Sequence, residues 1–190
     1  MSSQVQICNL ALSRLGANRI TSLTDNTTEA KLCNIFYDDI AEEVMCEGPW
    51  TSVVTRAQLA QTTNTPAYEY SYEYQLPTNP KCLKVLSINE EDPGTYDFRI
   101  EGDKLLADIS TMKIRYLGFI SDTEQYDVML KRAIVSRLAA ELSYPITSDP
   151  AVIQQMYDLY AVHVSEGLAI DGQQGSGDLT RSRDLHDVRN

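Results

Sequence analysis

The sequence predicts an α+β fold: an α-helical bundle of N- and C-terminal helices, an inserted antiparallel β module, and an extended C-terminal arm. Three observations support this fold class. Apolar residues recur at helical spacing over residues 1–49 and again over 121–170, which predicts the helical bundle. Short runs with a period of two fill residues 50–120, which predicts the β module. Residues 171–190 have no apolar periodicity, which is typical of a flexible arm.

The first helix is predicted over residues 3–16. Ser3 and Gln6 have the spacing of a capping box, in which two side chains satisfy free backbone N–H groups at a helix start. Gly16 is a residue type favoured just past a helix end. The apolar stripe between these signals consists of Val5, Cys8, Leu12 and Leu15.

A second helix is predicted from Asn26 to about Glu47. Asn26 followed by Glu29 gives the start signal, and Gly48-Pro49 stops the helix. One face carries the apolar stripe Cys33, Tyr37, Ile40 and Val44. At about 100° per residue, roughly the opposite face carries the carboxylates Asp38, Asp39 and Glu42. One face is therefore expected to pack on the core, and the other forms an acidic face.

Six short alternating runs predict the strands of the β module. Gly102-Asp103 joins the fourth and fifth runs and predicts a hairpin. In the last run, Ile114 and Tyr116 face one way and charged residues face the other, so the sheet is expected to be antiparallel and half buried. The six runs cover residues 51–59, 68–76, 83–88, 96–101, 104–107 and 112–120.

Aromatic residues mark two places in this module. Tyr68, Tyr70, Tyr72 and Tyr74 alternate with other residues, so their rings are expected to share one strand face. That face is expected to pack on the module's own core, with an interface stripe as the alternative. Trp50 is expected to fill the core where the second helix meets the sheet, with an anchor for a neighbouring molecule as the alternative.

Two further helices are predicted after the β module. Ser121 and Glu124 have capping-box spacing, and Pro145 lies just beyond the expected end of the third helix. Asp149 with Pro150 is typical of an N-cap followed by proline at the first helical position. This fourth helix is expected to continue to about residue 170.

Composition excludes several classes of protein. The 190 residues carry a net charge of −11, which argues against a protein that grips nucleic acid through Lys and Arg. No basic stretch precedes an apolar run at the N-terminus, and no stretch approaches the roughly 20 apolar residues of a membrane helix. We therefore expect a protein that is made in the cytoplasm and has no membrane partner.

The polar residues do not form a recognised catalytic or metal-binding pattern. The cysteines have no Cys-x-x-Cys spacing and are expected to be reduced thiols that fill the core: Cys8, Cys33, Cys46 and Cys82. The carboxylates of the second helix could support acid–base chemistry or hold a metal, but no His or nucleophile is placed to complete a site; they are Asp38, Asp39, Glu42 and Glu43. His163 lies on the stripe of the last helix and is expected to be structural. No cofactor is expected, and a carboxylate-dependent hydrolase is kept only as an alternative.

Seven short segments provide a resemblance to a known family. In this order and spacing they resemble the tail tubular protein A family of tailed bacteriophages, the head-to-tail adaptors that sit beneath the portal. The resemblance covers roughly residues 4–170. The segments are Gly48-Pro49-Trp50, Arg56-Ala57-x-Leu59-Ala60, Tyr72-x-Tyr74-x-Leu76-Pro77, Cys82-Leu83-Lys84-Val85, Glu101-Gly102-x-x-Leu105-Leu106-x-Asp108, Ile114-x-Tyr116 and Ala139-x-Glu141-Leu142.

The resemblance implies a structural virion protein at the head-tail junction. Family members form a ring, usually a dodecamer, which binds the portal above and the tail nozzle or next tail protein below. Genome DNA passes through the ring without specific binding, so the acidic face of the second helix is expected to line this channel or to contact a neighbouring subunit. An arm reaching the portal is also implied, and its candidate residues here are Arg181, Arg183, Leu185 and Arg189. The alternative within the same class is a head-closure or stopper protein of a long-tailed phage.

Overall fold

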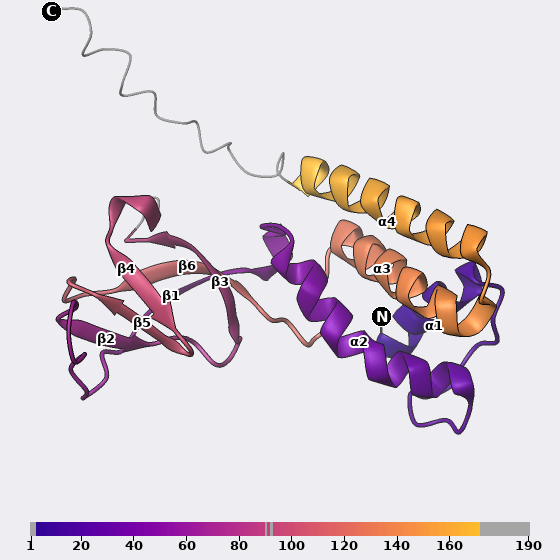
Figure 1. Cartoon of the computed structure of the whole chain (residues 1–190), viewed down its shortest axis with the longest axis horizontal. Helices are drawn as coiled ribbons and strands as arrows, with labels where there is room; N and C mark the ends of the chain where they lie inside the picture. Colours follow the sequence, from indigo (N-terminus) through magenta and orange to yellow (C-terminus); the bar gives the residue numbers. More distant parts are fainter. Residues whose placement is uncertain (1–2, 90, 92, 172–190) are drawn as a thin grey trace, which may run out of the picture.

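The computed structural model describes residues 3–89, 91 and 93–171, and it has the predicted α+β fold. A helical bundle and a β module lie side by side along the long axis of the molecule (Figure 1). The four candidate arm residues Arg181, Arg183, Leu185 and Arg189 lie outside the described residues. The helices are α1 (Gln4–Arg14), α2 (Thr28–Cys46), α3 (Val128–Thr147) and α4 (Pro150–Asp171). The strands are β1 (Val54–Gln58), β2 (Tyr72–Gln75), β3 (Cys82–Ile88), β4 (Phe98–Glu101), β5 (Lys104–Ala107) and β6 (Lys113–Gly118).

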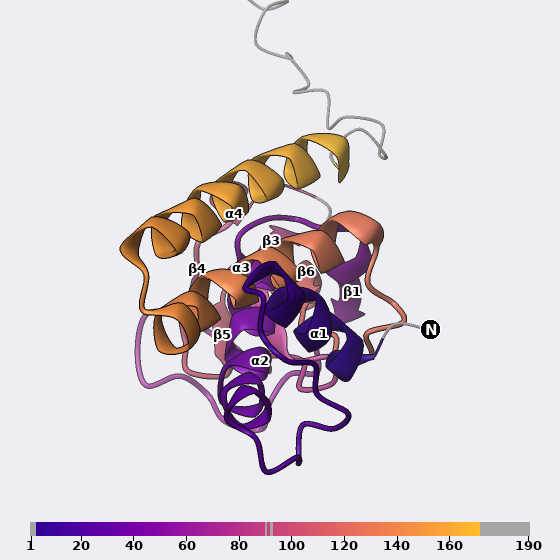
Figure 2. The same ribbon diagram turned by 90° about the vertical axis from the view of Figure 1, so that its right-hand side faces the viewer.

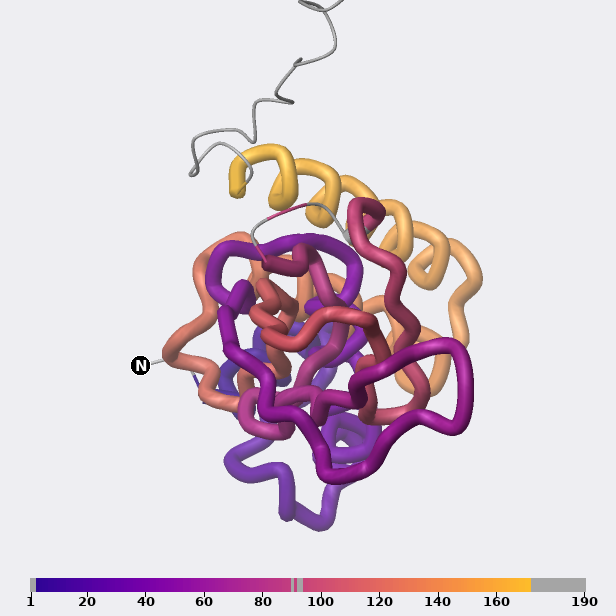
Figure 3. Tube along the Cα trace, turned by 90° about the vertical axis from the view of Figure 1, so that its left-hand side faces the viewer, coloured from indigo at the N-terminus to yellow at the C-terminus, as the bar shows by residue number. Residues whose placement is uncertain are grey.

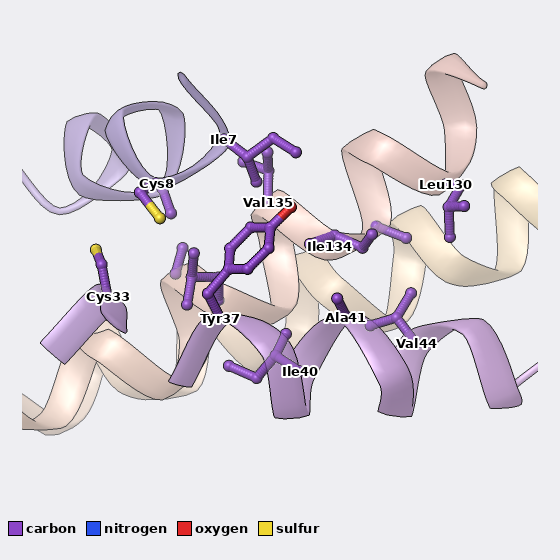
Figure 4. Close-up of a cluster of buried hydrophobic side chains, with 14 of the residues drawn as sticks. Ile7, Cys8, Cys33, Tyr37, Ile40, Ala41, Val44, Leu130, Ile134 and Val135 are labelled. Carbon is purple, nitrogen blue, oxygen red and sulfur yellow. The ribbon is translucent and has the colours of Figure 1, made fainter. Parts of the chain in front are cut away.

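The bundle is organised around α3, which packs against α1, α2 and α4 (Figure 2). The predicted stripe of α2 is buried in this core, whereas Asp38 and Asp39 are exposed on the opposite side of the helix. Figure 4 shows Tyr37 of α2 pointing between α1 and α3, close to Ile7 and Val135. Burying one such large apolar side chain contributes about 1.5–3 kcal/mol, so these stripes account for the association of the helices.

The starts of the first two helices follow the expected capping chemistry. Ser3 Oγ accepts a hydrogen bond from the backbone N–H of Gln6 at 3.2 Å, as predicted. The second helix begins one residue later than expected, because Thr27 rather than Asn26 is its N-cap. The Oγ1 atom of Thr27 accepts from the N–H of Ala30 at 3.2 Å.

The predicted boundaries of the third helix are wrong at both ends. Its N-cap is Asp127, whose Oδ1 accepts from the N–H groups of Met129 and Leu130 at 2.7 and 2.8 Å. Residues 121–127 are not helical, and Asp127 satisfies two free N–H groups at once where the helix begins. The helix also continues through Pro145 to Thr147. Proline removes one N–H donor near the end of a helix, and that loss is small enough here for one more turn to form.

Among the described residues, the β module consists of two three-stranded antiparallel sheets, with strand orders β1–β6–β3 and β2–β5–β4. Figure 3 shows the chain trace of the module from its free end, with the helices behind it. The predicted hairpin is confirmed, because Glu101 pairs with Lys104 and Gly102 takes a positive φ of 60° in the turn. Ile114 and Tyr116 of β6 are buried, as predicted. The first run is shorter than expected, since residues 51–53 form a 3-10 helix ahead of β1.

The four tyrosines do not share one strand face. The strand begins only at Tyr72, and Glu69 has a φ of +66°, which interrupts the alternation that the sequence suggested. Tyr70 and Tyr74 are buried, whereas Tyr68 is 74% exposed. The hydroxyl of Tyr74 donates to the carbonyl of Ile109. Tyr74 therefore belongs to the core of the module, as expected, and Tyr68 lies at the surface.

The four cysteines divide by position. Cys8 of α1 and Cys33 of α2 are buried and face each other across the two helices (Figure 4), and their hydrogen bond and burial raise the pKa of Cys8. Cys82 is half buried, and burial raises its pKa to about 11. Cys46 is exposed, contrary to the prediction, because it lies two residues past the last stripe position of α2 and points to solvent.

Candidate functional site

The three carboxylates of the predicted acidic face of α2 differ in their partners. Asp38 and Asp39 are exposed and form no ion pair within the part of the chain that is described. Glu42, one turn further on, is half buried and receives the ammonium of Lys81 from the β module at 2.6 Å. Hydrogen bonding to Glu42 raises the pKa of Lys81. Both partners of this pair reach solvent, so the contact orients the module more than it stabilises it.

Glu43 belongs to a separate network that joins three helices. It accepts two hydrogen bonds from Nη2 of Arg137 in α3, at 3.1 and 3.2 Å. Nη1 of Arg137 also pairs with Glu141 at 2.6 Å, and its guanidinium lies 5.5 and 5.6 Å from the ring centres of Tyr157 and Tyr160 in α4. Sequence reasoning missed Arg137, because its partners come from three separate helices.

Glu42 and Glu43 therefore have different partners on different sides of α2. Each carboxylate is held by a cation from another element. Among the described residues, no three His, Cys, Asp or Glu side chains are grouped so that they could hold a metal ion.

The connection between bundle and β module is tightly packed around Trp50. Its side chain is fully buried, as predicted, and its Nε1–H donates to the carbonyl of Val44 at 2.9 Å. A Cβ atom added at Gly167 of α4 would lie 2.9 Å from the indole ring. A Cβ atom added at Gly48 would lie 2.3 Å from the Leu168 side chain. Glycine at both positions therefore permits the end of α4 to lie directly on this connection.

Two carboxylates fasten the same connection through hydrogen bonds. Asp171, at the end of α4, accepts from the N–H and hydroxyl of Thr51 at 2.5 and 3.0 Å. Asp127, the N-cap of α3, accepts from the hydroxyl of Ser52 at 2.7 Å. We call Trp50, Thr51, Asp127, Gly167 and Asp171 the junction. The junction holds the first turn of the β module against the helices, and it lies where the predicted arm begins.

A buried polar cluster connects α1, α3 and α4. Ser136 Oγ lies 2.6 Å from Nδ1 of His163, 2.7 Å from Nη1 of Arg14 and 2.7 Å from the carbonyl oxygen of Arg132. One hydroxyl proton satisfies all three contacts only if Ser136 donates to the carbonyl and accepts from Arg14 and from the Nδ1–H of His163. In that arrangement His163 cannot act as a base toward Ser136. His163 is buried, as predicted, and its structural role stays a prediction.

A shallow groove between α1 and α3 is the feature that sequence reasoning missed most completely. It has a volume of about 330 Å³ and combines three cations with apolar side chains. Leu10 is 44% exposed and Val128 is 71% exposed at its edges. Both are apolar residues outside the buried stripes of their helices, and this is the feature of the sequence from which an exposed apolar surface could have been predicted. The groove is lined by Leu10, Ser13, Arg14, Val128, Lys131, Arg132 and Val135.

Comparison with known proteins adds no assignment. No protein-family model matches the sequence, and no curated protein was found to be similar to it. Within the described residues, none of the helices combines the length and apolar character needed to cross a bilayer.

Proposed function

We propose that this protein is a structural virion protein of a tailed bacteriophage, a head-to-tail adaptor at the junction of head and tail. Its copies form a ring, most simply a dodecamer, that joins the portal to the tail nozzle or next tail protein. Genome DNA passes through the ring during packaging and ejection. The protein does this work by geometry and not by catalysis.

One observation carries the proposal. The helical bundle is built from both ends of the chain, with an antiparallel β module inserted between α2 and α3. This is the arrangement implied by the resemblance to the tail tubular protein A family. The segment Gly48-Pro49-Trp50, which belongs to that resemblance, forms the packed connection between the two parts.

Charge supports a passive channel. Each contact between Lys or Arg and a DNA phosphate adds attraction, and such contacts slow the movement of DNA through a ring. The chain has a net charge of −11. A ring of such subunits repels the DNA that it guides.

Attachment to the portal is assigned to the arm. The arm was predicted over residues 171–190, and it is shortened here to 172–190 because Asp171 is the last residue of α4. Its Arg181, Arg183 and Arg189 alternate with acidic residues, so the arm is close to neutral and suits protein docking better than DNA binding. A ring presents many arms at once, and this raises the effective concentration of each arm once the first has bound.

Removing residues 172–190 tests the proposal. The shortened chain ends at Asp171, because the carboxylate of Asp171 accepts hydrogen bonds from Thr51 at the junction. A deletion that also removed Asp171 would disturb the packing of the helices on the β module. We expect the truncated protein to keep its far-UV circular dichroism and melting temperature, and to lose co-sedimentation with portal rings encoded by the same genome. Full-length protein is the matched control. Equal co-sedimentation of the two would remove the arm from the mechanism, and no binding by full-length protein would overturn the proposed function.

The alternative of a carboxylate-dependent hydrolase has less support. It needs Glu42 or Glu43 to be available to a substrate, and each is bound to a cation from another element. No particular observation favours a head-closure or stopper protein over the adaptor.

A further inference from the structure

We propose that the groove between α1 and α3 of one copy receives the outer face of α2 from the next copy, and that this contact closes the ring. The inference rests on the proposed function, and it assigns the two surfaces through which the subunits meet. We define the outer face of α2 by Ile35, Asp38 and Asp39.

The groove carries positive charge that the described part of its own chain does not neutralise. Lys131 forms no ion pair with any described residue. Arg14 is half buried and bonds the neutral hydroxyl of Ser136, not a carboxylate. Only Arg132 has an acidic partner, Glu166, at 3.2 Å. Burial and the nearby charge of Arg132 lower the pKa of Arg14, which agrees with an excess of positive charge at this place.

The groove also has apolar side chains that a partner would cover. Val128 and Leu10 are 71% and 44% exposed beside these cations. Covering exposed apolar side chains is favourable, and cations pair with carboxylates, so a partner that sets an apolar side chain beside carboxylates would suit both. The chemistry of the groove therefore specifies its occupant.

The outer face of α2 has this complementary chemistry. Ile35 is 63% exposed, and Asp38 and Asp39 follow it at spacings of three and four residues, so the three side chains are neighbours on one face of the helix. Neither carboxylate has an ion-pair partner within the described residues. A second copy of this chain can therefore place an apolar side chain against Leu10 and Val128, and two carboxylates near Lys131 and Arg14.

The position of the two surfaces decides the kind of assembly. The buried stripe of α2 packs in the core with α1 and α3, so its outer face points away from that core, whereas the groove is formed by α1 and α3. One copy cannot bring the two surfaces together by itself. A contact between two different surfaces is heterologous, and it repeats from copy to copy until the rotation closes a ring.

The proposed contact also offsets the repulsion between copies of the chain. Copies with a net charge of −11 repel one another in general, so a ring needs interfaces that set positive groups against negative ones. The groove supplies a concentrated positive surface for this purpose.

Complementary charge reversal tests the inference. One variant carries Lys131→Glu, which reverses the groove at its unpaired cation. A second carries Asp38→Lys and Asp39→Lys, which reverses the outer face of α2. Lys113→Glu on the exposed side of β6 is the matched control for Lys131→Glu. It makes the same change of charge at a position away from both surfaces. Circular dichroism and melting temperature establish that each variant is folded.

Self-association is measured by light scattering and sedimentation velocity on the full chain, over concentrations up to about the millimolar range where weak interfaces are populated. We expect the wild type and K113E to associate alike, and each charge-reversed variant alone to associate about tenfold or more weakly. Mixing the two reversed variants restores part of the association, because in an alternating ring the carboxylate introduced at position 131 meets the introduced lysines, and the unchanged groove meets the unchanged Asp38 and Asp39. Association of the wild type should also weaken as salt is raised.

Three results would overturn the inference: a wild type that stays monomeric throughout, reversed variants that associate as the wild type does, or a mixture that stays dissociated. Loss of association in K131E without loss in the α2 variant would mean that the groove has another occupant, such as an acidic peptide. Co-sedimentation of the full-length protein with portal rings is a separate measurement. The assignment of these two surfaces can therefore be refuted without refuting the proposed adaptor function.

Discussion

Replacing Gly167 with alanine is expected to destabilise the protein by crowding Trp50. The new Cβ atom would lie 2.9 and 3.0 Å from Cζ3 and Cη2 of the indole and 3.4 Å from Cβ of Met129. Trp50 is fully buried and its indole is held by the hydrogen bond to the carbonyl of Val44, so we expect the ring to move little. Crowding of this kind costs about 1–3 kcal/mol, whereas glycine to alanine inside a helix gains about 1 kcal/mol. The net result is a loss of up to about 2 kcal/mol.

The same substitution should stabilise a protein that carries Trp50→Phe. Phenylalanine has no atoms in the positions of Cζ3 and Cη2, so the alanine at 167 meets open space and the helix gain of up to about 1 kcal/mol remains. W50F by itself loses the hydrogen bond to Val44 and part of a buried ring, at a cost of about 1–3 kcal/mol. The sign of the Gly167→Ala effect therefore reverses between the two backgrounds.

A double-mutant cycle measures this reversal. The four proteins are the wild type, G167A, W50F and the double variant. Their free energies of unfolding are measured by urea denaturation with far-UV circular dichroism as the signal, because the W50F variants have no tryptophan fluorescence. Ser165→Ala is the control, because Ser165 is exposed on the same helix and should behave alike in both backgrounds. The coupling energy between Trp50 and Gly167 is expected to be about 1–3 kcal/mol. An equal effect of G167A in both backgrounds would refute the packing argument.

Two further predictions concern titratable side chains. Burial and the charges of two nearby arginines lower the pKa of His163, so the unfolded state binds more protons near neutrality, and stability should fall as pH drops below about 6.5. H163Q, which does not titrate, should show a smaller difference in urea midpoint between pH 7.5 and 5.5; an equal difference would contradict the assignment. For the thiols, Ellman's reagent should label Cys46 first and Cys82 slowly, and should reach Cys8 and Cys33 only on unfolding. C46S should remove the fast phase, and its persistence would show that a buried thiol is accessible.

Local periodicity predicted the parts of the fold that depend on one element at a time. The stripe of α2 was predictable, because burial on a helix repeats at every third or fourth residue and Tyr37 and Ile40 follow that spacing. The fold class also followed, since the change of period at Trp50 marks the passage from helices to strands. The boundaries were less predictable. Asp127 caps α3 in place of Ser121 because several residues near the helix start can cap it, and the structure selects the one whose carboxylate reaches two N–H groups.

Features that join distant segments were not predictable. The alternation of tyrosines is broken by one backbone angle at Glu69, which the side-chain pattern does not reveal. Arg137 becomes important only when α2 and α4 supply its partners. The groove has the same origin, since Leu10 and Lys131 are far apart in sequence and meet because α1 packs against α3. Of the candidate site, the sequence predicted the acidic face of α2 but not the surface that complements it.

The junction connects the two proposals physically. Ring contacts between bundles fix the position of the β module only if the bundle and module move together, and Trp50, Asp127 and Asp171 provide that connection. Asp171 is also the last residue before the arm, so its hydrogen bonds to Thr51 set the point from which each arm starts. In the proposed ring, arms that start from fixed points reach the portal at a spacing set by the ring, and this is the condition under which many weak contacts act together. A loosened junction should therefore weaken portal attachment even where ring contacts and arm are unchanged, and co-sedimentation of G167A with portal rings tests that consequence directly.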